Sequence, residues 1–106
     1  MNSLTQSQYK HFLVTIDNAT DEQCGQFTKY LDNSATGYWH WMARVWIIVD
    51  VHPTSNAQAW RLKVCGIMPG AFVFVVQFRP QDDWSAWTPN AGIDWLLQYL
   101  GATRQI

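Results

Sequence analysis

The sequence YWHWMARVWIIVDV, residues 38–51, determines the number of strands in the sheet, because it forms either one long strand or two short ones. It contains neither Gly nor Pro, yet it is too long for one average strand. We predict a break at residues 42–44, between an aromatic strand at residues 38–41 and a second strand at residues 45–51. Pro53 then ends the pairing of the second strand. If the stretch were a single unbroken strand, the sheet would lose one member.

The segment before this stretch has the pattern of a strand followed by a helix. Residues 9–16 alternate between apolar and polar side chains, which is typical of a strand with one buried face. Thr20 and Gln23 have the spacing of a capping box, in which each side chain binds the backbone of the other residue. Apolar residues then recur at helical spacing, as expected for one buried stripe: Cys24, Phe27 and Leu31.

The segment after this stretch predicts a helix, a strand and a further helix. Ser55 and Gln58 repeat the capping-box spacing ahead of a second helix. Residues 71–78 are almost continuously apolar, which favours a strand that is covered on both faces or central in the sheet. Thr88 and Pro89 have the residue types of an N-cap and a first helical turn. From these elements we predict four core residues: Phe27, Trp60, Phe74 and Leu97.

The resulting element order is β-α-β-β-α-β-α within one predicted domain, residues 1–106. Two right-handed β-α-β crossovers in one sheet give a ferredoxin-like βαββαβ fold, with strands in the spatial order 4-1-3-2. The predicted class is therefore α+β, with an antiparallel sheet and an additional C-terminal helix.

The composition predicts a protein that associates with itself. Apolar residues make up 48% of the chain and charged residues only 14%, where about 25% charged is usual. Such a small domain has too few charges to cover its surface, so some apolar surface is left for a partner. Symmetric dimers are the commonest assembly, and we expect a homodimer. The net charge of −1 lacks the basic stripe of a duplex-binding protein, so nucleic acid is not an expected partner.

The same sequence predicts a cytoplasmic protein. The first ten residues are polar and do not resemble a signal peptide. The longest apolar run is far shorter than the roughly 18 residues of a membrane helix, so no membrane partner is expected. Cys24 and Cys65 fall in predicted helices and are expected to be free thiols rather than a disulfide.

Most of the chain resembles the SinR-like small proteins of bacteria and phages. The segments that carry the resemblance are the aromatic strand at residues 38–41, the strand VWIIV at residues 45–49, the capped helix, the strand FVFVV at residues 72–76 and the Trp-rich tail. The resemblance implies a ferredoxin-like fold related to the CRISPR adaptation subunit and to VapD-type toxins, and typically a homodimer. In the nuclease relatives, an Asp at the end of the first strand binds metal. Asp17 occupies that place here.

The best candidate for a metal-binding or catalytic site is Asp17 together with Asp50, with His52 as a further candidate. In the predicted strand order, the first and third strands are interpreted as parallel neighbours, so their carboxylates would converge at one edge. Two carboxylates plus waters suit Mg²⁺, and Asp17 would then be the catalytic residue of a nuclease. In the alternative interpretation, Asp17 stabilises the turn after its strand, Asp50 is solvated, and no cofactor is required.

The tryptophans offer a second candidate site. Base stacking on a single strand would also need a basic groove. We therefore predict that Trp39, Trp41, Trp84 and Trp87 form a dimer or protein interface, where Trp is enriched. The favoured hypothesis is a homodimeric, non-enzymatic interaction module that binds itself or another protein. A metal-dependent nuclease and a phage or mobile-element inhibitor of a host machine remain alternatives.

Overall fold

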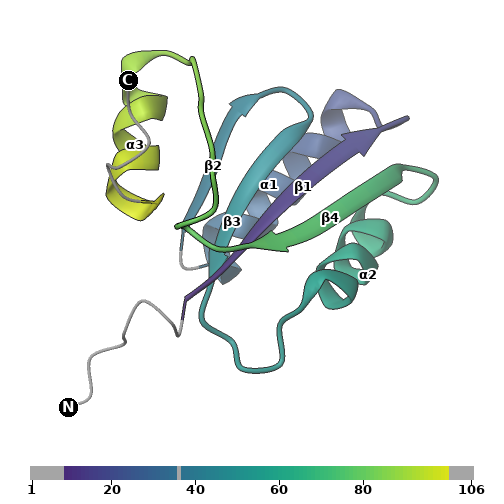
Figure 1. Ribbon diagram of the computed structural model, residues 1–106. Coiled ribbons are helices and arrows are strands. Elements are labelled where there is room, and N and C mark those ends of the chain that lie inside the picture. The colour runs from purple at the N-terminus through teal and green to yellow at the C-terminus, as the bar shows by residue number, and fades with distance from the viewer. Residues whose placement is uncertain (1–8, 36, 101–106) are drawn as a thin grey trace.

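The computed structural model describes residues 9–35 and 37–100, which form a four-stranded antiparallel sheet and three helices (Figure 1). The predicted α+β class is thereby confirmed. In chain order the elements are β1 (Lys10–Asp17), α1 (Asp21–Ser34), β2 (Gly37–Met42), β3 (Val45–Asp50), α2 (Ala57–Ile67), β4 (Phe72–Phe78) and α3 (Asn90–Leu100). None of these helices combines the length and the apolar character needed to span a bilayer.

The predicted break between β2 and β3 is confirmed. A turn at residues 43 and 44 joins the two strands, and they pair antiparallel with Tyr38 opposite Ile48 and Trp39 opposite Ile47. The pairing shifts register between Trp39 and Met42, so β2 is irregular toward its end.

The strands lie in the order β2-β3-β1-β4, which is the predicted order read from the other edge. The interpretation of the first and third strands as parallel neighbours is wrong, because β1 pairs antiparallel with β3, with Lys10 opposite Asp50. The reason lies in the connections. The crossover through α1 returns β2 in the direction of β1, and the tight turn then reverses β3.

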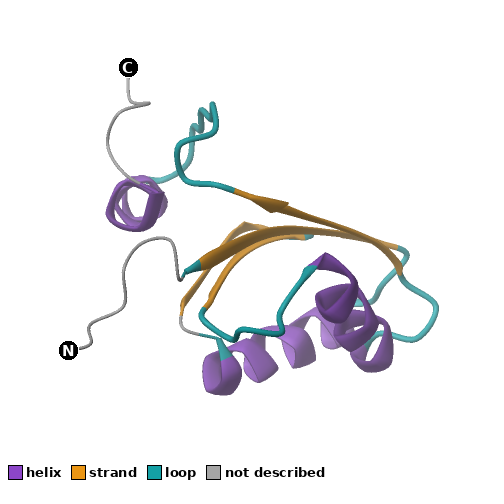
Figure 2. Cartoon of the chain, turned by 60° about the horizontal axis from the view of Figure 1, so that its bottom comes forward, coloured by secondary structure: helices purple, strands orange, loops and turns teal. Residues whose placement is uncertain are grey.

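The two faces of the sheet are covered unequally (Figure 2). Helices α1 and α2 lie together on one face, whereas α3 lies on the other face beside β2. Between the sheet and the first two helices lies the main core, where Phe27 packs edge-on against Trp46 with ring centroids 5.1 Å apart. Its buried members include Phe12, Val14, Ile48, Trp60, Val64 and Met68.

The two predicted capping boxes have different outcomes. In α1 the box is confirmed, since the Gln23 N–H donates to Thr20 Oγ1 at 3.1 Å and the Thr20 N–H donates to Gln23 Oε1 at 2.9 Å. In α2 the N-cap is Asn56, whose Oδ1 accepts from the Ala59 N–H at 2.8 Å. Ser55 is not the cap, because its hydroxyl donates to Asp50 instead.

Strand β4 differs most from expectation, because it is an edge strand with one exposed face. Phe72 is 67% exposed, Phe74 64% and Val76 38%, so the prediction of Phe74 as a core residue is wrong. Phe27 and Trp60 are buried as predicted, and Leu97 is half-buried. The physical reason is that α3 packs over β2 and β3 and leaves the β4 side of the same face uncovered.

The difference in burial between Phe27 and Phe74 predicts a large loss of stability for one Phe→Ala variant and a small change for the other. Phe27→Ala removes a fully buried ring and should lower the free energy of unfolding by about 3–5 kcal/mol. Phe74→Ala removes an exposed ring and should change it by at most about 1 kcal/mol. Denaturant unfolding at low protein concentration measures both. Equal losses would contradict the burial described for β4.

Candidate functional site

Strand β4 exposes a row of apolar side chains, the β4 patch, formed by Phe72, Phe74 and Val76. These residues alternate along the strand and therefore point to the same face of the sheet. The patch continues into a groove of about 460 Å³ between the sheet and the segment that leads into α3. Apolar side chains that line the groove include Leu13, Val45, Ile47, Val76, Trp84 and Trp87.

Helix α3 forms one wall of the groove and is fixed closely against β2. The Trp39 indole N–H donates to the Gly92 carbonyl at 3.2 Å. A Cβ on Gly92 would lie 2.5 Å from Thr88 Oγ1 and 3.0 Å from the Trp41 ring, so only glycine allows this approach. Leu96 and Leu100 of α3 are buried against Trp39.

The segment between β4 and α3 begins with a turn closed by Asp82. Its carboxylate accepts from the Arg79 N–H at 2.9 Å and from the Arg79 guanidinium at 3.1 Å. The backbone hydrogen bond and then the guanidinium lower the pKa of Asp82, so this carboxylate stays charged at the rim of the groove. The turn redirects the chain from the end of β4 toward α3 (Figure 1).

The four tryptophans predicted as interface residues differ in exposure. Trp39 is 4% exposed and packs against α3, so it does not reach the surface. Trp41 is 45% exposed and Trp87 98% exposed, while Trp84 is half-buried in the groove wall. The residues that the sequence interpretation missed are those of the β4 patch. The sequence carries no signal for their exposure, because β4 is apolar at nearly every position.

Asp17 lies in an exposed turn at the end of β1. Its Oδ1 accepts from the Asn18 N–H at 2.7 Å. Asn18 has a φ of 60°, a left-handed conformation that Asn tolerates, and its side-chain amide donates to the Gly70 carbonyl at 2.9 Å. Asp17 therefore stabilises the turn that ties the end of β1 to the loop between α2 and β4.

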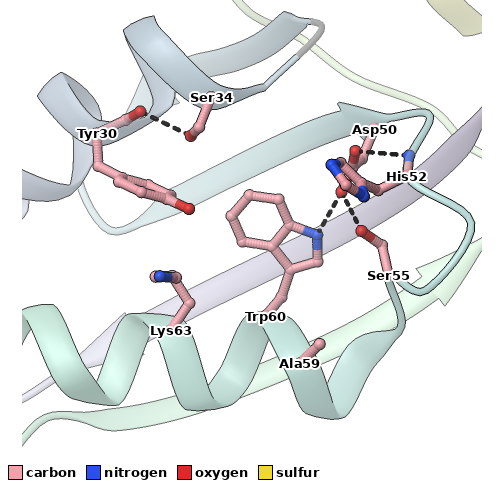
Figure 3. A pocket seen from close by; sticks show the side chains of 8 residues that line it. All are labelled: Tyr30, Ser34, Asp50, His52, Ser55, Ala59, Trp60 and Lys63. Atoms are coloured by element: carbon pink, nitrogen blue, oxygen red, sulfur yellow. Dashed lines mark hydrogen bonds between the residues drawn. The ribbon is translucent and has the colours of Figure 1, made fainter.

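Asp50 lies at the end of β3 and is only 5% exposed, in a hollow of about 200 Å³ between α1 and α2 (Figure 3). Its carboxylate accepts from the His52 N–H at 3.0 Å, from the Trp60 indole at 3.2 Å and from the Ser55 hydroxyl. The expectation that Asp50 is solvated is wrong. Its oxygens are occupied by donors from its own chain, and they connect the end of β3 to the start of α2.

The two aspartates do not come together. Asp50 is paired with Lys10, whereas Asp17 lies seven residues further along β1 and is paired with Phe72. At about 3.3 Å per strand residue, this separates them by about 23 Å. The two carboxylates of one chain cannot share an ion, and no group of three metal-ligating side chains occurs in the described part of the chain.

Burial shifts the pKa of two further side chains, His11 and Cys24. Burial lowers the pKa of His11, against the smaller opposing effect of a hydrogen bond with the Tyr99 backbone, so the imidazole is neutral at neutral pH. Burial raises the pKa of the Cys24 thiol, which disfavours the nucleophilic thiolate. Both side chains belong to packed interiors and not to the groove.

No protein-family model matches the chain, and no curated protein matches it. The candidate site therefore follows from the geometry alone, and the β4 patch with its groove is its most distinctive feature.

The different roles of the two aspartates predict different effects on stability. Asp50→Ala leaves the buried Trp60 N–H without its acceptor and should lower the free energy of unfolding by about 1–3 kcal/mol. Asp17→Asn keeps a turn-forming side chain and should cost less than about 1 kcal/mol.

Thermal unfolding with and without Mg²⁺ or Mn²⁺ provides the matched control for this pair. We expect neither ion to shift the Tm of the wild-type protein or of either variant. A rise in the wild-type Tm that disappears in Asp17→Asn would contradict the structural role described for Asp17.

Proposed function

We propose that this chain is a homodimeric, non-enzymatic protein-interaction module with a ferredoxin-like core and one additional C-terminal helix. The observation that carries the proposal is the β4 patch, whose two phenylalanines are about two-thirds exposed. Burying a Phe side chain fully contributes about 1.5–3 kcal/mol, and this chain leaves most of that stabilisation unused. A partner that covers the patch recovers it.

Two properties of the surrounding surface support an interaction site. The patch is continuous with the apolar groove, and Trp87 stands 98% exposed at the groove wall. Exposed apolar surface of this kind, with a charged carboxylate at its rim, is typical of protein interfaces. A few residues supply most of the binding energy at such interfaces, and Trp and Tyr are enriched among them.

The ferredoxin-like class is part of the proposal and is supported by the element order and by the antiparallel order β2-β3-β1-β4. We extend the proposal to the cytoplasm, which is supported by the two unpaired thiols, Cys24 and Cys65. The similarity to SinR-like proteins stays a prediction, as do the nuclease and the inhibitor of a host machine.

The proposal predicts that self-association depends on the patch. Phe74→Ser should raise the dimer dissociation constant at least about tenfold, because the variant loses an interfacial ring from each copy. Leu62→Ser is the matched control, since Leu62 is 56% exposed but lies on α2, in the layer on the opposite side of the sheet.

Sedimentation velocity over a wide concentration range measures both variants. A wild-type protein that remains monomeric throughout would refute the homodimer. Equal weakening by Phe74→Ser and Leu62→Ser would show that association is non-specific and does not use the β4 patch.

A further inference from the structure

The two edges of the sheet differ in how open they are to another strand. The β2 edge is interrupted by the register shift before Met42, and α3 packs against this strand. The β4 edge is regular, since it pairs with β1 without a shift from Phe72 to Phe78. An edge strand without a bulge, a charge or a proline is a template for pairing with another chain.

The backbone groups that face outward from β4 follow from the register. The Ile16 N–H donates to the Arg44 carbonyl at 3.0 Å, toward the β3 side. Because hydrogen-bonded and non-hydrogen-bonded positions alternate along an antiparallel strand, Thr15 directs its backbone groups toward β4.

Thr15 lies opposite Phe74, so Phe74 directs its N–H and C=O inward to β1. By the same alternation, neighbouring positions along β4 direct theirs to the free edge. The outward-facing residues are Val73, Val75 and Gln77.

Charge favours a second copy of the chain as the occupant of this edge. A twofold axis through β4 brings the middle of the strand beside the middle of its own copy, so a charge there would lie close to the same charge on the second copy. The sequence FVFVVQF carries none. The strand is therefore electrostatically compatible with its own copy, which is the partner that a self-complementary interface requires.

The exposed area limits what the pairing can bury. Two phenylalanines about two-thirds exposed, and Val76 at 38%, expose roughly 300 Å² per copy. Edge pairing brings Phe74 and Val76 into contact across the strand pair but leaves their outer surface on the open face, so only part of this area is buried. The interface therefore falls below the low end of specific interfaces, about 1,200 Å², and the dimer should dissociate on dilution.

We propose that two copies pair antiparallel through their β4 edges about a twofold axis at Val75, forming one continuous eight-stranded sheet. This proposal rests on the proposed homodimer and specifies how it forms. Centring the axis at Val75 pairs the full strand length, so Gln77 exchanges hydrogen bonds with Val73 of the second copy. Phe74 then lies opposite Val76 of the second copy, on the open face.

Gln77→Pro tests the pairing, with Gln77→Ala as its matched control. Gln77 is exposed and its N–H faces the free edge, so Pro removes no hydrogen bond to β1. Both variants lose the side chain, but only Pro lacks the N–H. Gln77→Pro should raise the dissociation constant at least about tenfold relative to Gln77→Ala, because symmetry doubles the loss.

Disulfide trapping tests the register if Gln77→Pro does not fold. Copies carrying Phe74→Cys and copies carrying Val76→Cys are mixed in a Cys65→Ser background and oxidised. These positions form a non-hydrogen-bonded pair with Cα atoms about 4.5 Å apart, within disulfide range. The mixture should give more cross-linked dimer than either variant alone.

The outcomes separate this inference from the proposed function. Equal dissociation constants for folded Gln77→Pro and Gln77→Ala would overturn edge pairing, while weakening by Phe74→Ser would leave the homodimer standing. A mixture that cross-links no better than the single variants would likewise overturn the Val75-centred register. A wild-type protein that is monomeric at every concentration would overturn both proposals.

Discussion

Two helices cover one face of the sheet and a single helix covers part of the other, and the exposed apolar surface results from this difference. One face is closed by α1 and α2, and the core beneath them holds Phe27 and Trp46 in edge-on contact. The other face has a single helix, which the Trp39–Gly92 hydrogen bond fixes over β2. One helix cannot cover four strands, so β4 stays open. The apolar side chains that remain there give the chain its interaction surface.

The acidic residues serve this architecture and do not form a common site. The Asp50 carboxylate joins the end of β3 to the start of α2 by accepting from the Trp60 indole and the Ser55 hydroxyl. A buried carboxylate needs such donors to offset its desolvation. Asp17 closes the turn at the far end of β1. Both aspartates help to position strands. Asp50 anchors the start of α2, and β4 is the next element along the chain.

Local patterns in the sequence predicted most of the fold. The capping box at Thr20 and the break between β2 and β3 depend on neighbouring residues, and both are confirmed. The capping pattern at Ser55 was wrong because a distant carboxylate, Asp50, takes its hydroxyl. Competition of that kind is a tertiary effect that spacing along the chain does not reveal.

The candidate site was harder to predict, because it depends on chain direction and coverage. An apolar run such as β4 looks the same whether a helix covers it or not, and its exposure depends on where α3 docks. Likewise, the convergence of Asp17 and Asp50 required parallel strands, whereas the turn before Val45 makes them antiparallel. The sequence predicts that the tryptophans lie at an interface, whereas the burial of Trp39 depends on its contact with α3.

Amide hydrogen exchange shows whether the outer edge of β4 pairs with a second copy. Exchange rates report whether each N–H is hydrogen-bonded. If the edges pair, the N–H of Val75 should exchange rapidly in dilute protein and become protected as the protein concentration rises. The N–H of Phe74, which faces β1, should be protected at every concentration. A Val75 N–H that exchanges as an open amide at all concentrations, beside a protected Phe74 N–H, would rule out pairing through this edge.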